Sequence, residues 1–274
     1  MGGRNFRTWV AAAVFAALAA LSSGAGAKDV QLKTSASTDW SDIWWNPAES
    51  GWGIQLVQEG GTVFATLFVY GADGRPTWFI AVLTLSGGNM LSGPLFATTG
   101  PYFGSDFNPA ATTVRQVGTM TFVASSIANA ALTYVVDGVV VTKAIERQTL
   151  SVDNYNGSYL VLLNSTTSAC NDPTLSGSST NALAISVAQT ASTMRMVWDF
   201  GGGSVCTYSG VYAQSGKFGR FSGPYSCNNG DAGTVSFIEM TNRVGILSGR
   251  LSGASSATGC ALTGRFTGLN PSVP

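Results

Sequence analysis

Short apolar runs separated by turn residues follow one another between residues 51 and 146. They read GWGIQLVQ, TVFATLFVY, PTWFIAVLTL, NMLSGPLF, TMTFVAS, ALTYVVDG and VVVTKAIE. These runs are rich in β-branched and aromatic residues and are too short for typical helices, so the pattern predicts strands. Between the second and third runs, Asp73 and Gly74 form a pair that accepts the positive φ angles of a tight hairpin turn.

Two of these predicted strands are apolar on both faces. The run 62–70 places Phe64, Phe68 and Tyr70 on one face and aliphatic side chains on the other, and the run 77–85 behaves in the same way. A sheet with one solvated face alternates apolar and polar residues instead. We therefore expect both faces to be covered, one by the interior and the other by the second domain, another subunit or a ligand.

The composition changes between residues 148 and 156, where an aromatic-rich half gives way to a half rich in Ser, Thr, Gly and Cys. We place a domain boundary there, which gives an aromatic-rich β domain at 41–150 and a Cys/Gly-rich domain at 151–274. The pattern apolar-Ser/Thr-Gly-x-apolar recurs as YSGVY, FSGPY, LSGRL and LTGRF, at intervals that suit strand-plus-turn units. The predicted fold is all-β, with two antiparallel barrel-like or sandwich-like meander domains, the second disulfide-bonded.

The register of one hairpin in the second domain can be derived. A two-residue turn at Gly216 and Lys217 makes aromatic residues face aromatic residues, glycine face glycine and cysteine face cysteine, and a slip by one residue destroys every match. The predicted pairs are Tyr212 with Phe221, Gly210 with Gly223, Tyr208 with Tyr225, and Cys206 with Cys227. Paired glycines in mid-strand suggest sharp coiling, as in a small barrel.

The first 27 residues have the layout of a secretory signal peptide. Arg4 and Arg7 precede an apolar run at 9–21, and small residues follow. We expect cleavage before Lys28, a flexible segment at 28–40, and a mature protein that is soluble and exported to the periplasm or the extracellular space. No later stretch reaches the length of a membrane-spanning helix.

Charge and residue content exclude several classes of function. Without Arg4 and Arg7 the chain has 12 basic and 14 acidic residues, so nucleic acid is not an expected partner. The complete absence of histidine excludes Ser-His-Asp and Cys-His nucleophilic sites and the usual zinc centres. No Ser-x-x-Lys site or glycine-rich nucleotide loop occurs. We expect no cofactor, no metal and no catalytic residues.

All four cysteines lie in the second half, and an oxidising compartment favours disulfides. Zinc binding is the rival interpretation, but no Cys-x-x-Cys pair occurs. The hairpin register pairs Cys206 with Cys227, so Cys170 and Cys260 remain to form a second bridge that ties the ends of a closing meander.

The segment DIWWNPAESGWG at 42–53 allows two interpretations. Glu49 could accept backbone N–H bonds that hold the loop closed. Alternatively, Glu49 and Asn46 could be polar anchors at the mouth of a tryptophan-walled binding site. The candidate ligand-binding residues of this second interpretation are Trp44, Trp45, Asn46, Glu49, Trp52, Arg75 and Trp78.

WWNPAESGWGIQL, followed by TVFATLFVYGADGRPTWF, resembles a motif of an uncharacterised family of exported bacterial β domains, with the pattern W-W/Y-N-P-x-E-S-G-x-G. The resemblance covers residues 43–95. It implies a secreted bacterial β domain and carries over no catalytic residue. The region 150–274 shares only a loose sequence pattern, strands that contain glycine and aromatic residues, with lipocalin-like and avidin-like barrels.

The leading functional prediction is an exported, non-catalytic protein that binds a sugar or an apolar small molecule at an aromatic-walled site. The alternative is a secreted interaction module or inhibitor that meets another protein through an apolar β face, and oligomers are compatible with either. A hydrolase that uses paired carboxylates is a third hypothesis, with Asp42, Glu49, Glu59 and Asp73 as its candidates. An outer-membrane barrel is a fourth.

Overall fold

The computed structural model describes residues 38–273. The predicted signal peptide and residues 28–37 of the predicted flexible segment lie outside this range. The last residue of that segment, Trp40, is 7% exposed and packs against Trp44 with the two rings 6.4 Å apart. An indole of this size gains more from burial than from solvation, so residue 40 belongs to the packed domain. Within residues 38–273 no helix is long and apolar enough to cross a membrane.

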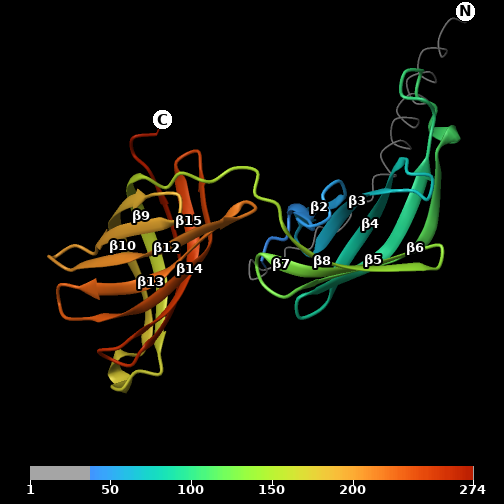
Figure 1. The fold of residues 1–274 in the computed structure, drawn as a ribbon. Helices are drawn as coiled ribbons and strands as arrows, with labels where there is room; N and C mark the ends of the chain where they lie inside the picture. The colour runs from blue at the N-terminus through green and yellow to red at the C-terminus, as the bar shows by residue number, and fades with distance from the viewer. Residues whose placement is uncertain (1–37, 274) are drawn as a thin grey trace, which may run out of the picture. The chain divides into compact units, whose positions relative to one another are not determined.

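Eight antiparallel strands form a first closed barrel, drawn from blue to light green in Figure 1. They are β1 (Asp42–Trp45), β2 (Gly53–Glu59), β3 (Thr62–Tyr70), β4 (Pro76–Gly87), β5 (Met90–Thr99), β6 (Thr113–Ala124), β7 (Asn129–Val136) and β8 (Val139–Arg147). A short 3₁₀ helix, η1 (Pro109–Ala111), precedes β6. Each strand pairs with the next along the chain, and β1 pairs with β8 to close the barrel.

A second closed barrel of eight antiparallel strands follows, drawn from yellow to red in Figure 1. It contains β9 (Gly157–Ser168), β10 (Gly177–Gln189), β11 (Thr193–Asp199), β12 (Val205–Ser215), β13 (Phe218–Cys227), β14 (Ala232–Arg243), β15 (Ile246–Ser255) and β16 (Ala261–Leu269). The 3₁₀ helix η2 (Pro173–Leu175) lies before β10. Closure by pairing of β16 with β9 leaves no free sheet edge. The predicted all-β meander architecture is thus confirmed, in its barrel form.

Alternation of side chains along the strands fills each barrel interior. In β9, Tyr159, Val161 and Leu163 are buried while Leu160 and Leu162 between them are exposed, because successive side chains point to opposite faces. The core of the first barrel is mostly aliphatic around Trp44 and Phe122, whereas that of the second is richer in aromatic residues. Each barrel therefore has its own hydrophobic core.

The derived hairpin register is confirmed. Cys206 lies opposite Cys227, Tyr208 opposite Tyr225, and Tyr212 opposite Phe221 across β12 and β13. The glycine pair permits a close approach of the strands, since a Cβ on Gly210 would lie only 2.8 Å from the Cα of Gly223. Gly216, the first residue of the two-residue turn, has a φ of 58°, which explains why that position favours glycine.

Both predicted disulfides are present. One joins Cys206 to Cys227 and the other joins Cys170 to Cys260, with no free cysteine among the described residues. Cys170 follows β9 and Cys260 precedes β16, so the second bridge links the first and last strands of the barrel near one end. The hairpin at 71–75 also forms, but there only Gly74 has a positive φ, at 74°.

Among residues 38–273 nothing covers the outer face of β3 and β4, so the second domain does not supply the expected cover, and cover by another subunit or a ligand stays a prediction. Phe64, Phe68 and Tyr70 are 43%, 49% and 57% exposed, and Trp78 is 49% exposed. The aliphatic face of β3 fills the barrel interior. The aromatic face is left outside because a single-layer barrel has only one interior surface.

Candidate functional site

Trp44 lies in the core of the first barrel and is fully buried, with its ring edge against Phe122 at a centroid distance of 4.9 Å. Its indole N–H donates to the backbone oxygen of Trp40. Side chains of β1 alternate, so Trp45 is turned away from this core and is half-buried. Trp44 thus packs the interior and offers no surface to a ligand.

Asn46 and Glu49 organise the loop between β1 and β2. The Asn46 side chain accepts from the backbone N–H of Ala48, and its backbone oxygen accepts from that of Glu49, which makes an Asx-type turn. Among residues 38–273, Glu49 accepts no backbone N–H bond, although one interpretation of the sequence expected such bonds. Its carboxylate instead accepts from Trp52 Nε1 at 3.0 Å and pairs with Lys143 Nζ at 2.7 Å.

The Lys143 ammonium lowers the pKa of the Glu49 carboxyl through this hydrogen bond, while partial burial opposes the shift. Lys143 lies on β8 and also approaches the Trp52 ring, 6.0 Å from its centroid. The structure therefore brings together Glu49, Trp52 and an unpredicted lysine. Their mutual contacts satisfy one another, so the group orders the loop.

The two remaining predicted residues lie on other surfaces. Trp78 is on the outer face of the barrel, and Arg75 is in the exposed hairpin turn, 3.7 Å from Asp73. Only part of the predicted ligand-binding set is thus assembled around one point. In the part of the chain that the structure describes, the seven residues are therefore divided among the barrel core, two loops and the outer face.

An aromatic cavity does exist, and it lies in the second barrel. It has a volume of about 140 Å³ and receives at least one side chain from each of the eight strands. Its walls combine aromatic and aliphatic side chains with the Cys206–Cys227 bridge, and Ser165, Asn181 and Asp231 add polar groups. The residues that matter for its chemistry are Trp198, Phe200, Tyr208, Tyr225, Asp231 and Phe237.

Trp198 is the central aromatic residue of this cavity. It is 1% exposed, and its ring lies 5.1 Å from Tyr208, 5.4 Å from Phe237 and 5.7 Å from Phe266 between centroids. Its indole Nε1 is buried and has no hydrogen-bond partner among residues 38–273. A buried N–H without a partner costs about 1 to 3 kcal/mol, so a ligand whose acceptor atom bonded to Nε1 would recover that free energy.

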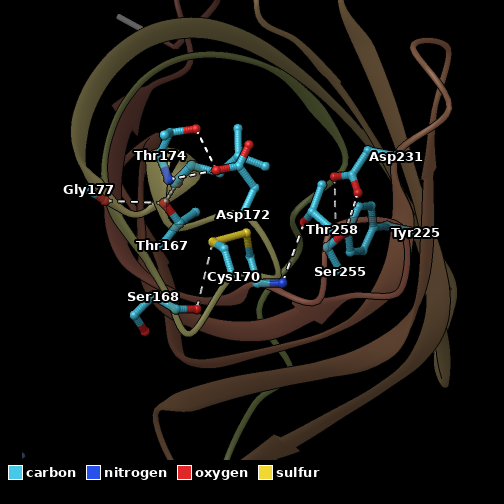
Figure 2. The surroundings of a disulfide bond; sticks show 12 residues. Thr167, Ser168, Cys170, Asp172, Thr174, Gly177, Tyr225, Asp231, Ser255 and Thr258 are labelled. Atoms are coloured by element: carbon cyan, nitrogen blue, oxygen red, sulfur yellow. Dashed lines mark hydrogen bonds between the residues drawn. A yellow bond between two sulfur atoms is a disulfide. The ribbon is translucent and has the colours of Figure 1, made fainter.

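Asp231 is the charged residue that lines this cavity. Figure 2 shows its carboxylate facing Tyr225 and Ser255, whose hydroxyls donate to it at 3.1 Å and 2.5 Å. Burial, followed by the negative charge of Asp231, raises the pKa of Tyr225 to about 12. Burial is also the main cause that raises the pKa of Tyr208. Both tyrosines therefore stay neutral to a higher pH than an ordinary tyrosine does.

The two disulfides frame this end of the barrel. Cys206 and Cys227 line the cavity themselves, and Figure 2 shows the bridge at Cys170 in the same region as Asp231. The loop that follows β11 contains three consecutive glycines at 201–203, all with positive φ. The disulfides therefore tie strands beside the cavity, and the three glycines give the loop a backbone conformation that other residues rarely adopt.

The sequence carried a partial signal for this cavity. The hairpin register already placed Tyr208, Tyr225, Cys206 and Cys227 on one face, and these four line the cavity. Trp198 was missed because the sequence provides no register for β11, and its position opposite Cys206 is set by the pairing of β11 with β12. The site holds no paired nucleophile and base, and its one carboxylate is engaged by two hydroxyls.

No family model and no curated protein matches this chain. Among solved structures, transferrin binding protein B from serogroup B Neisseria meningitidis matches 80% of this chain and 65% of its own, at 9% identity and a TM-score of 0.23. A tryptophan-to-alanine mutant of transferrin binding protein B from Haemophilus parasuis matches 80% of this chain and 60% of its own, at 10% identity and a TM-score of 0.23. The chain spans less than two thirds of either structure. What is established for this protein is the fold class, two closed antiparallel β barrels, the second of them disulfide-bonded.

Proposed function

We propose that the protein is a non-catalytic binding protein whose second barrel takes a small, largely apolar molecule with one hydrogen-bond acceptor. The observation that carries this proposal is the vacant indole donor of Trp198, which lies among the aromatic walls of the cavity. Binding sites for small molecules combine apolar walls with a few placed polar groups. An acceptor on the ligand would satisfy the buried Trp198 donor, which has no partner among residues 38–273.

The size and polarity of the cavity favour an apolar ligand over a sugar. About 140 Å³ is close to the volume of roughly 150 Å³ at which an apolar protein cavity accepts benzene. A sugar would bring several hydroxyl groups into a space whose carboxylate, Asp231, already accepts from Tyr225 and Ser255. Unpaired hydroxyls in such a space are costly. The expected ligand is therefore a ring or short chain with a carbonyl-type oxygen.

The test uses cyclohexanone as the probe and benzene as a probe of similar shape without an acceptor. The indole N–H resonance of Trp198 is followed by ¹⁵N-resolved NMR during each titration. Cyclohexanone should shift this resonance downfield and benzene should not. Trp198→Phe should weaken cyclohexanone binding about tenfold, as expected for one lost hydrogen bond, and leave benzene binding nearly unchanged.

Trp52→Phe is the control, because the Trp52 indole donates to Glu49 in the first barrel. It should change neither titration. If the Trp198 resonance responds to neither probe at millimolar concentrations, or if Trp198→Phe binds both probes as well as the parent protein does, the proposed function is wrong.

An interaction with another protein is the second candidate, and the outer face of the first barrel is the observation that favours it. The strands β3, β4 and β5 contain no Asp, Glu, Lys or Arg, and four aromatic residues on β3 and β4 are 43–57% exposed. Exposed apolar patches of this kind mark interaction surfaces in soluble proteins. Sedimentation velocity of the parent protein and of Phe68→Lys, with Leu160→Lys on the second barrel as the control, would detect self-association through this face.

A further inference from the structure

The outer surface of the second barrel carries a groove that belongs to neither proposed function. It lies over β9, β15 and β16 and has a volume of about 560 Å³. A second depression of about 390 Å³ adjoins it. Asn164, Arg250 and Arg265 line both and therefore lie between them. The two volumes together suit an extended ligand better than a single small ion.

The strand register places two positive charges side by side between the two depressions. Arg250 on β15 lies directly opposite Arg265 on β16, and Asn164 on β9 lies opposite Arg265 on its other side. Like charges directly opposite each other on adjacent strands destabilise a sheet. The pair therefore gives the fold no electrostatic benefit, and an anion placed between the two guanidinium groups would remove the repulsion.

Glu239 on β14 partly compensates one of the two arginines. Its Oε1 accepts a hydrogen bond from Arg250 Nη1 at 3.1 Å. Glu239 itself lies in a bulge of β14, where its φ is 54°. Bulges of this kind re-aim a side chain. Within residues 38–273, Arg265 forms no ion pair, and its side chain is exposed. The cluster keeps a net positive charge on a chain whose formal net charge is zero.

The remaining lining residues indicate the chemical class of the ligand. Thr166, Ser252 and Thr263 present hydroxyl groups along the groove, and Ile238 adds an apolar surface. A guanidinium binds a carboxylate with two parallel hydrogen bonds, whereas hydroxyls and amides pair with the hydroxyl groups of a sugar ring. We propose that this groove binds an acidic oligosaccharide, with the carboxylate of a uronic acid unit between Arg250 and Arg265 and neighbouring sugar rings along Thr166, Ser252 and Thr263.

The test measures binding by isothermal titration calorimetry with tetragalacturonate, with maltotetraose as a neutral sugar of similar length and with inorganic phosphate as a simple anion. Tetragalacturonate should bind, and its affinity should fall as salt is raised, because the contact is charged. Maltotetraose should bind at least about tenfold more weakly, since it lacks the carboxylates that make charge-assisted hydrogen bonds. Phosphate should bind weakly, because it cannot use the hydroxyl-lined length of the groove.

Arg265→Gln should weaken tetragalacturonate binding at least about tenfold. Its matched control is Arg195→Gln, an exposed arginine on β11 that lines neither depression. Trp198→Phe should bind tetragalacturonate like the parent protein, so the groove and the interior cavity are tested separately. Far-UV circular dichroism melts verify that each variant folds.

Equal affinities for tetragalacturonate and maltotetraose would overturn the proposal. So would equal losses in Arg265→Gln and Arg195→Gln, which would indicate nonspecific attraction by positive charge. Phosphate binding as tight as that of tetragalacturonate would reduce the groove to a simple anion site and would also contradict it.

Discussion

Arg147 Nη1 lies 2.9 Å from Asp42 Oδ2, and the guanidinium side chain is completely buried. This pair joins β8 to β1, the two strands whose pairing closes the first barrel with only a short ladder. The guanidinium also lies over the ring of Trp44, 4.5 Å from its centroid, and donates from Nε to the backbone oxygen of Ile127. Burial lowers the pKa of Arg147, and the Asp42 carboxylate opposes that shift.

Arg147→Met should destabilise the protein by about 3 to 5 kcal/mol, because it leaves the Asp42 carboxylate without its buried partner. Urea unfolding monitored by circular dichroism measures the loss. Arg115→Met is the control. Arg115 makes a similar pair with Asp137, but both side chains are more than half exposed, so solvent screens the interaction and the loss should be much smaller. Equal losses in the two variants would show that the buried pair does not secure barrel closure.

Removal of Trp44 should damage the fold, whereas removal of Trp78 should not. Trp44→Ala should cost about 3 to 5 kcal/mol, because it opens a cavity in the core of the first barrel. Trp78 is 49% exposed on the outer surface, so Trp78→Ala should have a small effect on the urea midpoint. A stable Trp44→Ala variant would contradict the assignment of Trp44 to the core.

The two disulfides should contribute unequally to stability. Cys170 and Cys260 are 90 residues apart, and Cys206 and Cys227 are 21 apart. In the chain-entropy model, loops of these lengths correspond to about 4.6 and about 3.3 kcal/mol. Paired Cys-to-Ser variants of each bridge, compared by urea unfolding, should therefore rank the long bridge first. A larger loss for the short bridge would mean that its place beside the aromatic cavity matters more than its effect on the unfolded chain.

The buried tyrosines should make the protein lose stability at high pH. The pKa of Tyr225 is raised from 10.0 to about 12 by burial and by Asp231, and that of Tyr212 to about 12 by burial and by Asp153. Above pH 10 the unfolded chain releases these phenolic protons while the folded chain retains them. The stabilising contribution is therefore complete below pH 10 and is lost as the pH rises towards about 12.

Melting temperatures measured from pH 8 to pH 12 should fall most steeply above pH 10, and Tyr225→Phe should flatten this decline. Tyr102→Phe, at a residue that is 67% exposed, should not. Parallel curves for the parent protein and Tyr225→Phe would show that the Tyr225 hydroxyl is not held in its neutral form by the fold.

Local patterns in the sequence determined the fold class, one hairpin register and both disulfides. The pairing of Tyr208 with Tyr225 and of Cys206 with Cys227 follows from period-two alternation around a glycine turn, because a register shift by one residue would separate every matched pair. The pairing of Cys170 with Cys260 then follows by elimination. The fold class and the hairpin register depend on residues close together in the chain. The second disulfide follows because only two cysteines remain once the first pair is assigned.

The placement of functional surfaces was decided only by the tertiary structure. The sequence grouped seven residues around the tryptophan loop, but alternation along β1 places Trp44 inside the barrel, and Trp78 lies on its outer face. Trp198 and Tyr225 line one cavity because their strands enclose a common interior, and Asn164 joins Arg265 in one groove because closure pairs β9 with β16. Sequence periodicity tells which residues share a face of one strand. Closure and strand pairing decide which strands share an interior, and no local pattern contains that information.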